Sequence, residues 1–141
     1  MTAVSEADET IAWASRLLDA GRGVRWGIRD RAGSFAGTIG FNSLVREHGS
    51  RGELGYDVVR ARWRQGVMAE VMPAVLDHAF GPLGLHRVEA MVTPGNVASA
   101  ALLIAQGFRL EGLLRDHGYW LGRFWDQQVF ARLATDAVSP G

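Results

Sequence analysis

The sequence predicts an α/β fold with a mixed sheet and the element order αβββαβαββ. Segments in which apolar and polar residues alternate, as in half-buried strands, are interspersed with segments of helical periodicity. Strands separated by a helix favour a parallel crossover, whereas the last two strands are close enough in sequence for an antiparallel hairpin. The chain has 141 residues, of which 48% are hydrophobic, so it can build a core without disulfides.

The elements follow from local patterns. An amphipathic helix is expected over residues 5–20, with Ser5 and Asp8 as a capping box and Gly21 after its end. Strands are expected at residues 24–28, 34–41 and 53–59, followed by a helix that opens at residues 63–70 and runs to about residue 80. The remaining elements are a strand at residues 86–92, a helix at 97–106 capped by Asn96, and strands at 110–121 and 125–133 joined at residues 122–124.

Composition excludes several classes of protein. The 15 basic and 15 acidic residues balance and form no run, so no nucleic-acid partner is expected. The chain contains no cysteine, and all its basic residues are arginine, so thiol and Schiff-base catalysis are excluded. The histidines have no metal-ligand spacing, and no metal is expected. Without a signal peptide or a long apolar stretch, we expect a cytoplasmic protein with no membrane partner. It should be a single domain over residues 1–141, with an ordered core at about 5–133 and a short flexible C-terminal tail.

Two helix starts are candidates for ligand binding. The loop that leads into the helix ending near residue 80 carries Gly66 after two arginines, and the first turn of a helix offers unpaired N–H groups that hold phosphate. Arg62 and Arg64 are placed to pair with phosphate oxygens. The second start carries Asn96 and Ser99. Taken singly, these features also fit an ordinary strand-to-helix turn with solvated arginines and a surface serine. Together they aim two helix N-termini at one sheet edge, where open α/β sheets bind ligands.

The ordered series of motifs resembles the GNAT N-acetyltransferase superfamily, in particular its ribosomal-protein N-terminal acetyltransferase (RimJ/RimL-type) branch. The resemblance covers residues 26–133. It is carried by Glu53-Leu54-Gly55-Tyr56, Trp63-x-x-Gly66 with Glu70, Leu85-His86-Arg87-Val88-Glu89-Ala90, Asn96-x-x-Ser99, Gly107-Phe108-Arg109-Leu110-Glu111-Gly112, and Gly122-Arg123 with Asp126.

This resemblance implies a V-shaped split between two parallel strands that holds acetyl-CoA as the acyl donor. The backbone amides of residues 64–69 would cradle its pyrophosphate, and backbone groups near the end of the third strand would pair with the pantetheine arm. The implied cofactor-binding residues are Val58, Val59, Arg64, Gln65, Gly66, Val67, Met68, Ala69, Asn96 and Ser99.

The implied reaction is direct transfer of the acetyl group to a primary amine, either a protein N-terminus or a small molecule. Many relatives carry a tyrosine where this chain has Leu103, and Ser99 matches the serine that some members use to protonate the leaving thiolate. Glu53 is the first candidate for the general base, against the alternative of a structural carboxylate paired with an arginine. Glu111 and the Asp116-His117 pair are further candidates.

One departure from the family pattern concerns the start of the chain. The first strand and first helix of the fold have no counterpart before Ser5, which predicts an unpaired strand at the sheet edge and a possible homodimer that covers it. The alternative function is a non-catalytic acyl-CoA-binding module with an incomplete acceptor site. A domain that only dimerises and binds no ligand is a third reading.

Overall fold

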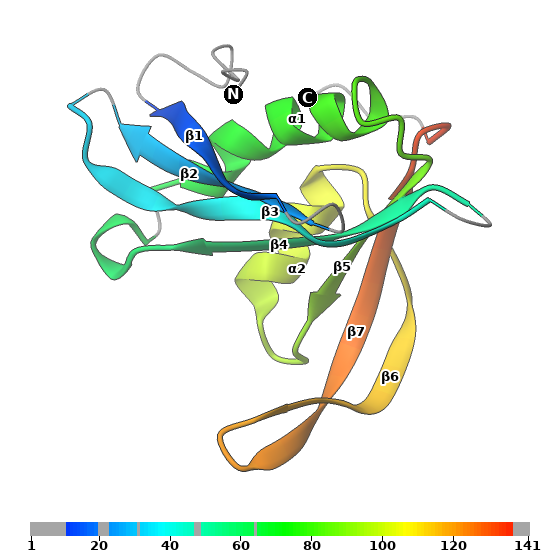
Figure 1. Ribbon diagram of the computed structural model, residues 1–141. Helices are drawn as coiled ribbons and strands as arrows, with labels where there is room; N and C mark the ends of the chain where they lie inside the picture. The colour runs from blue at the N-terminus through cyan, green and yellow to red at the C-terminus, as the bar shows by residue number, and fades with distance from the viewer. Residues whose placement is uncertain (1–10, 20–22, 31, 47–48, 64, 137–141) are drawn as a thin grey trace.

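The architecture is that of a computed structural model, which describes residues 11–19, 23–30, 32–46, 49–63 and 65–136. In chain order the elements are β1 (Ile11–Asp19), β2 (Val24–Asp30), β3 (Phe35–Val45), β4 (Arg51–Val58), the short 3₁₀ turn η2 (Arg60–Arg62), α1 (Val67–Phe80), β5 (Arg87–Val92), α2 (Val97–Ala105), β6 (Arg109–Trp120) and β7 (Arg123–Leu133). The strands form one seven-stranded sheet in the order β1-β2-β3-β4-β5-β7-β6 (Figure 1).

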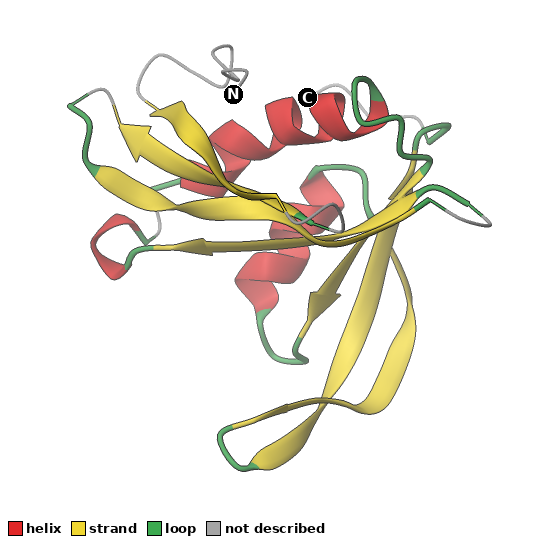
Figure 2. Ribbon diagram, viewed as in Figure 1, coloured by secondary structure: helices red, strands yellow, loops and turns green. Residues whose placement is uncertain are grey.

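The sheet is mixed, as predicted. β1 to β4 form an antiparallel meander, β4 and β5 run parallel, and β7 is antiparallel to both β5 and β6. A parallel pair needs a long connection, and α1 supplies it between β4 and β5 (Figure 2). The predicted α/β class and mixed sheet are therefore confirmed.

The first element differs from the prediction. Residues Ile11–Asp19 form β1, paired antiparallel with β2 from Ile11↔Asp30 to Asp19↔Val24, so the predicted helix is wrong there. The rest of the predicted helix, residues 5–10 and 20, lies outside the described residues. A short apolar run fits both periodicities, and in a strand its backbone groups satisfy the outer edge of β2. The element order is accordingly ββββαβαββ.

This strand also corrects the expected sheet edge. The strand at Val24–Asp30 is paired along its whole length with β1, so it is not the unpaired edge strand that the sequence predicted. The homodimer was expected only because that strand was predicted to be unpaired, so this reason for a homodimer no longer applies.

The core lies between the sheet and the two helices. Alternate residues of the strands point toward the helices, where Trp26, Phe41 and Leu54 are at most 3% exposed. The indole ring of Trp26 contacts the ring of Phe41 edge-on, with their centroids 6.4 Å apart, and the His78 ring of α1 lies 5.6 Å away from the same indole. α2 adds the fully buried Leu103 to the same cluster. Both helices therefore cover one face of the sheet.

The hairpin of β6 and β7 extends away from the body of the molecule (Figure 1). Its turn lies at Leu121 and Gly122, with φ of 54° and 74°, rather than at the predicted residues 122–124. Two left-handed residues in succession are typical of the tight turn that matches the twist of a hairpin. Next to the turn, the rings of Trp120 and Trp125 stack at 5.4 Å, so the end of the hairpin is stabilised by its own side chains.

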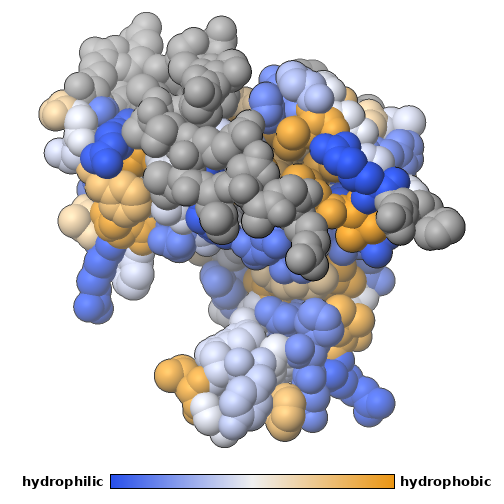
Figure 3. All heavy atoms as spheres, in the orientation of Figure 1, coloured by the Kyte–Doolittle hydropathy of each residue, from blue (hydrophilic) through white to orange (hydrophobic). Residues whose placement is uncertain are grey.

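The surface of this hairpin is mixed in character. Figure 3 shows apolar atoms at its end beside hydrophilic ones, clear of the rest of the molecule. Within the described part of the chain, no helix is long and apolar enough to cross a membrane.

Candidate functional site

The main cleft opens where the two parallel strands separate. β4 and β5 pair from Arg51↔Arg87 to Leu54↔Ala90, and the described residues show no pairing between them beyond this point. Each strand continues, β4 beside β3 and β5 beside β7, so a gap opens in the middle of the sheet. The gap forms a cleft of about 890 Å³, which confirms the predicted split between two parallel strands.

The cleft is lined by residues of β3, β4, β5 and β7, of the loops that follow β4 and β5, and of both helices near their starts. They are Asn42, Glu53, Leu54, Gly55, Tyr56, Asp57, Val58, Arg62, Trp63, Gly66, Val67, Met68, Ala69, Met91, Val92, Thr93, Asn96, Ala98, Ser99, Leu102 and Gln127. Most of the site residues predicted from the sequence are therefore brought together. Val59 and Gln65 do not line the cleft, and Arg64 lies outside the described residues.

The end of β4 offers backbone groups to the cleft. The N–H of Val59 donates to the carbonyl of Ala36 on β3, at 2.9 Å. In an antiparallel ladder alternate residues turn their polar groups away from the partner strand, so Val58 directs its N–H and carbonyl toward the split. The carbonyl accepts a 2.8 Å hydrogen bond from the indole Nε1 of Trp63. The N–H of Val58 therefore remains as the backbone donor at this point of the cleft.

The start of α1 is an uncapped helix N-terminus beside the cleft. Gly66 is its N-cap, in the left-handed conformation with φ of 73°, and no side chain caps the helix. The Arg62 guanidinium, which borders the cleft, forms an ion pair with Asp30 and a 3.3 Å hydrogen bond to Gln65. The first-turn residues of α1 thus bring backbone N–H donors to the cleft, while Arg62 has protein partners.

The start of α2 holds a pair of hydroxyl groups. The Asn96 side chain accepts a 3.2 Å hydrogen bond from the backbone N–H of Ser99, as the predicted N-cap requires. The hydroxyl of Ser99 shares a 2.6 Å hydrogen bond with that of Tyr56, which lies on β4. Burial raises the pKa of the Tyr56 phenol, and the bond to Ser99 offsets part of this rise. Tyr56 therefore stays protonated near neutral pH.

Of the carboxylates predicted as candidate bases, Glu53 on β4 is the one that lines the cleft. Glu53 lines the cleft, and no hydrogen bond or ion pair joins its carboxylate to another described residue. Arg87, on the neighbouring strand β5, is bonded to Glu89 at 2.8 Å and to Glu111 at 2.6 Å. Hydrogen bonds from Arg87 lower the pKa of Glu111, which does not line the cleft.

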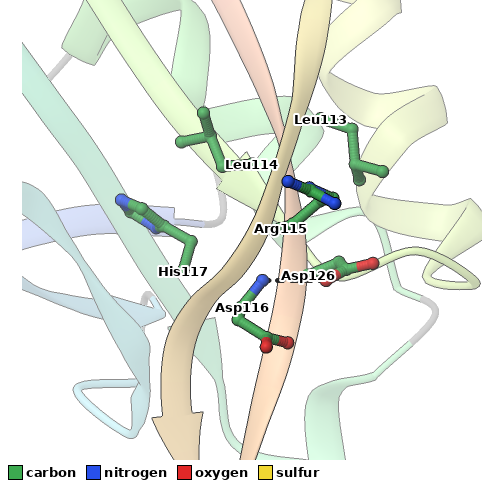
Figure 4. A pocket seen from close by; sticks show the side chains of 6 residues that line it. All are labelled: Leu113, Leu114, Arg115, Asp116, His117 and Asp126. Carbon is green, nitrogen blue, oxygen red and sulfur yellow. Dashed lines mark hydrogen bonds between the residues drawn. The ribbon is translucent and has the colours of Figure 1, made fainter.

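A second hollow, of about 710 Å³, lies where β6 bulges against β7. The register slips between Leu114 and Gly118, and Asp116 adopts a left-handed φ of 51° with its N–H donating to the Asp126 carboxylate at 2.8 Å. Figure 4 shows this contact, with His117 on the opposite side of β6 from Leu113. The His117 ring forms a 2.8 Å hydrogen bond with Gln127, which lines the main cleft. The bulge therefore supports one wall of that cleft.

Removal of the Asn96 cap should weaken α2 measurably. Asn96→Ala leaves the Ser99 N–H without its acceptor, so we expect the free energy of unfolding to fall by about 0.5–2 kcal/mol. Asn96→Asp is the control, because it keeps the acceptor at the same position and adds a favourable charge at a helix start. Urea denaturation followed by circular dichroism measures both variants. An equal loss in Asn96→Asp would contradict the capping role.

The sequence did not single out Tyr56, Trp63 and Gln127 as site residues. Tyr56 lies on the apolar side of an alternating strand, which predicted a core position. The polar hydroxyl of Tyr56 on the apolar face of this strand, near its end at the split, could have indicated a site residue. Trp63 stands in the quoted motif before Gly66 and bonds to Val58 five residues earlier, whereas Gln127 reaches the cleft from β7, a placement that no local pattern reports.

Comparisons with known proteins agree with this geometry. A family profile described as an acetyltransferase (GNAT) domain matches residues 1–109. An uncharacterized N-acetyltransferase of Bacillus subtilis (strain 168), YoaA, is 38% identical over 132 residues, which are 93% of this chain and 74% of that protein. The [ribosomal protein uS5]-alanine N-acetyltransferase of Escherichia coli (strain K12) is 30% identical over 105 residues, which are 74% of this chain and 54% of that protein.

Solved structures share the architecture. The ribosomal-protein-S5-alanine acetyltransferase of Vibrio fischeri superposes with a TM-score of 0.77 at 25% identity, over 85% of this chain and 66% of its own. The spermidine/spermine N-acetyltransferase SpeG of Vibrio cholerae, at 21% identity, shares the fold with a TM-score of 0.75, over 82% of this chain and 68% of its own. The profile, the relatives and the split sheet agree, and the chain belongs to the GNAT acetyltransferase family.

Proposed function

We propose that this protein transfers an acetyl group from acetyl-CoA to a primary amine by direct attack of the amine on the thioester. The observation that carries the proposal is the cleft between β4 and β5. The N-terminus of each helix borders it, as do a pair of hydroxyl groups and the Glu53 carboxylate, which has no partner among the described residues. No cysteine is present to form an acyl-enzyme, which is consistent with a single transfer step.

The donors in the cleft fit a pyrophosphate and a thioester. The uncapped first turn of α1 presents the N–H groups of Val67, Met68 and Ala69 beside Gly66, and such groups bind phosphate oxygens. Gly66 has open space around the position of a Cβ atom, so a ligand can approach its backbone. The N–H of Val58 can donate a hydrogen bond to the pantetheine arm or to the thioester carbonyl. The N–H of Val59 already donates to the carbonyl of Ala36 on β3.

Two side chains are proposed to handle protons. Ser99, at the start of α2, donates a proton to the leaving thiolate, and its capped backbone holds the hydroxyl in place. Glu53, with no other described partner, accepts the proton of the attacking amine directly or through water. Asn96 contributes by fixing the helix start on which Ser99 lies.

The acceptor is proposed to be an amine of a polypeptide N-terminus or of a small molecule. The names of relatives include both kinds, an alanine of ribosomal protein uS5 and spermidine or spermine. Each of these acceptors carries a primary amine, and the two relatives named for them share the fold of this chain.

Calorimetric titration with acetyl-CoA tests the donor half of the proposal. We expect saturable binding at one site, weaker binding of 3′-dephospho-CoA, and none of ATP. A panel of peptides and polyamines then tests transfer. Because the chain has no cysteine, the thiol released during turnover can come only from CoA. Binding without turnover would favour a non-catalytic acyl-CoA-binding module, and a folded protein without binding would overturn the proposal.

A glycine pair gives a sharper test of the phosphate site. Gly66→Ala and Gly84→Ala each force alanine into a left-handed conformation, at φ of 73° and 67°, with no atom near the added Cβ. Both should lose about 1–2 kcal/mol of stability. We expect only Gly66→Ala to weaken acetyl-CoA binding, by about tenfold, because Gly84 lies at the other end of α1. Equal affinities in the two variants would contradict a phosphate site at residues 66–69.

A further inference from the structure

The hydroxyl pair in the cleft joins two parts of the chain that are 43 residues apart. Tyr56 Oη and Ser99 Oγ are 2.6 Å from each other, and both side chains are half-buried in the cleft wall. Hydroxyl side chains that line the cleft are Tyr56, Thr93 and Ser99, and the first and last of them are bonded to one another.

Each member of the pair is positioned by its own element. Tyr56 pairs with Ile39 of β3 in the register of the sheet, and its ring packs against the core on the face that the helices cover. Ser99 is set by the Asn96 cap in the first turn of α2. At the level of Tyr56, β4 has already separated from β5, so the phenol reaches the helix start across the open split.

A hydroxyl group has one proton to donate and two lone pairs that accept. If Ser99 donates its proton to a ligand, the short bond to Tyr56 is maintained only with the phenol as the donor. The Tyr56 hydroxyl then donates its hydrogen bond to Ser99, and the Ser99 hydroxyl donates its own to the ligand. A phenol is also a far stronger acid than an aliphatic alcohol, so Tyr56 is the better source of the proton that finally leaves the pair.

We propose that Tyr56 is a positioning residue that acts through Ser99, orienting the serine hydroxyl and replacing its proton as the thiolate leaves. This inference rests on the proposed acetyl transfer and deepens it. The raised pKa of Tyr56 is consistent with it, because the phenol then carries its proton when the reaction begins.

The step balances. The amine nitrogen bonds to the carbonyl carbon, the carbon–sulfur bond breaks, and its electron pair goes to sulfur. The Ser99 proton moves to sulfur while the Tyr56 proton moves to Ser99. The proton that Glu53 takes from the amine returns through solvent to the Tyr56 oxygen, so the protein ends unchanged and the products are the amide and CoA.

Tyr56→Phe tests this inference, because it removes the hydroxyl and keeps the ring in the core. With acetyl-CoA and an accepted amine, we expect kcat to fall about 10- to 100-fold, while the Kd of acetyl-CoA changes less than about twofold. The loss is partial because Ser99 keeps its own hydroxyl proton, which it can still donate to sulfur. The matched control is Tyr119→Phe, the same change at the other tyrosine of the chain, which is 62% exposed on the hairpin and does not line the cleft.

Two readouts separate proton supply from a structural role. In single-turnover reactions in mixtures of H₂O and D₂O, the wild-type rate should depend on deuterium content with the curvature of two moving protons, and the rate of Tyr56→Phe with that of one. In addition, Tyr56→Phe combined with Ser99→Ala should be no slower than Ser99→Ala alone, since residues that act as a unit are not additive.

The outcomes distinguish the two levels of the argument. A wild-type chain that transfers acetyl groups while Tyr56→Phe keeps full kcat, or shows additive losses with Ser99→Ala, would overturn the role of Tyr56 alone. A folded wild-type chain that transfers to no amine would overturn the proposed function, and this inference with it.

Discussion

Replacement of Ser99 by alanine is expected to lower kcat by about 10²–10⁴-fold and to leave the Kd of acetyl-CoA within about twofold of the wild-type value. Thiolate departure needs a proton in the transition state, whereas donor binding depends mainly on the α1 amides and Val58. Fold and helix start should be retained, because the Asn96 cap bonds to the backbone N–H of residue 99, which alanine keeps. Steady-state kinetics and calorimetry on the same samples measure the two quantities.

Two further variants serve as controls for Ser99→Ala. Ser34→Ala makes the same change at an exposed turn, where the bond to Asp30 comes from the backbone N–H, and it should be silent. Ser99→Thr keeps a hydroxyl and should recover part of the lost rate. If Ser99→Ala lost kcat and donor affinity to the same extent, Ser99 would be a binding residue and not the proton donor.

Replacement of Phe41 by alanine should have the largest effect on stability, a loss of about 3–5 kcal/mol in the free energy of unfolding. Phe41 is 1% exposed, packs edge-on against Trp26 and lies beside Leu54 in the register of β3 and β4. Its removal leaves a cavity under the strand that leads into the cleft. Because domains are stable by only about 5–15 kcal/mol, urea denaturation should show a large drop in the unfolding midpoint.

Phe124→Ala is the matched control for this change. The ring is 57% exposed at the end of the β6–β7 hairpin and contacts Tyr119 with centroids 4.9 Å apart, so the loss should be about 1 kcal/mol or less. Similar losses in the two variants would contradict a core centred between the meander and the helices.

Elements with strong local signals agree between sequence and structure. The helix predicted to end near residue 80 is α1, which ends at Phe80, and the predicted cap Asn96 opens α2. Gly66 has a left-handed φ of 73°, which glycine adopts without steric cost and which the sequence did not predict. In these segments the end of a helix is fixed by residues next to it in the sequence, so the local pattern is sufficient to predict the element.

The first segment illustrates where local signals fail. Residues 11–19 hold apolar side chains that satisfy a helical period, yet they form β1 because the edge of β2 is available for pairing. Likewise, the sequence left open whether Glu53 has an arginine partner, because only the assembled sheet brings Glu111 of β6 to Arg87 of β5, which also bonds to Glu89 on its own strand. Choices of partner depend on the neighbours that the sheet provides.

By itself, the sequence determined the α/β class, the two helix starts, the absence of thiol chemistry and the cluster of motifs around Glu53, Gly66, Asn96 and Ser99. Only the tertiary structure decided that the strands part after Leu54↔Ala90 and that Tyr56 meets Ser99 across the opening. The reason is physical: periodicity and capping act over a few residues of the chain. A contact between residues 43 positions apart depends on strand register and on the crossover that brings α2 to the cleft.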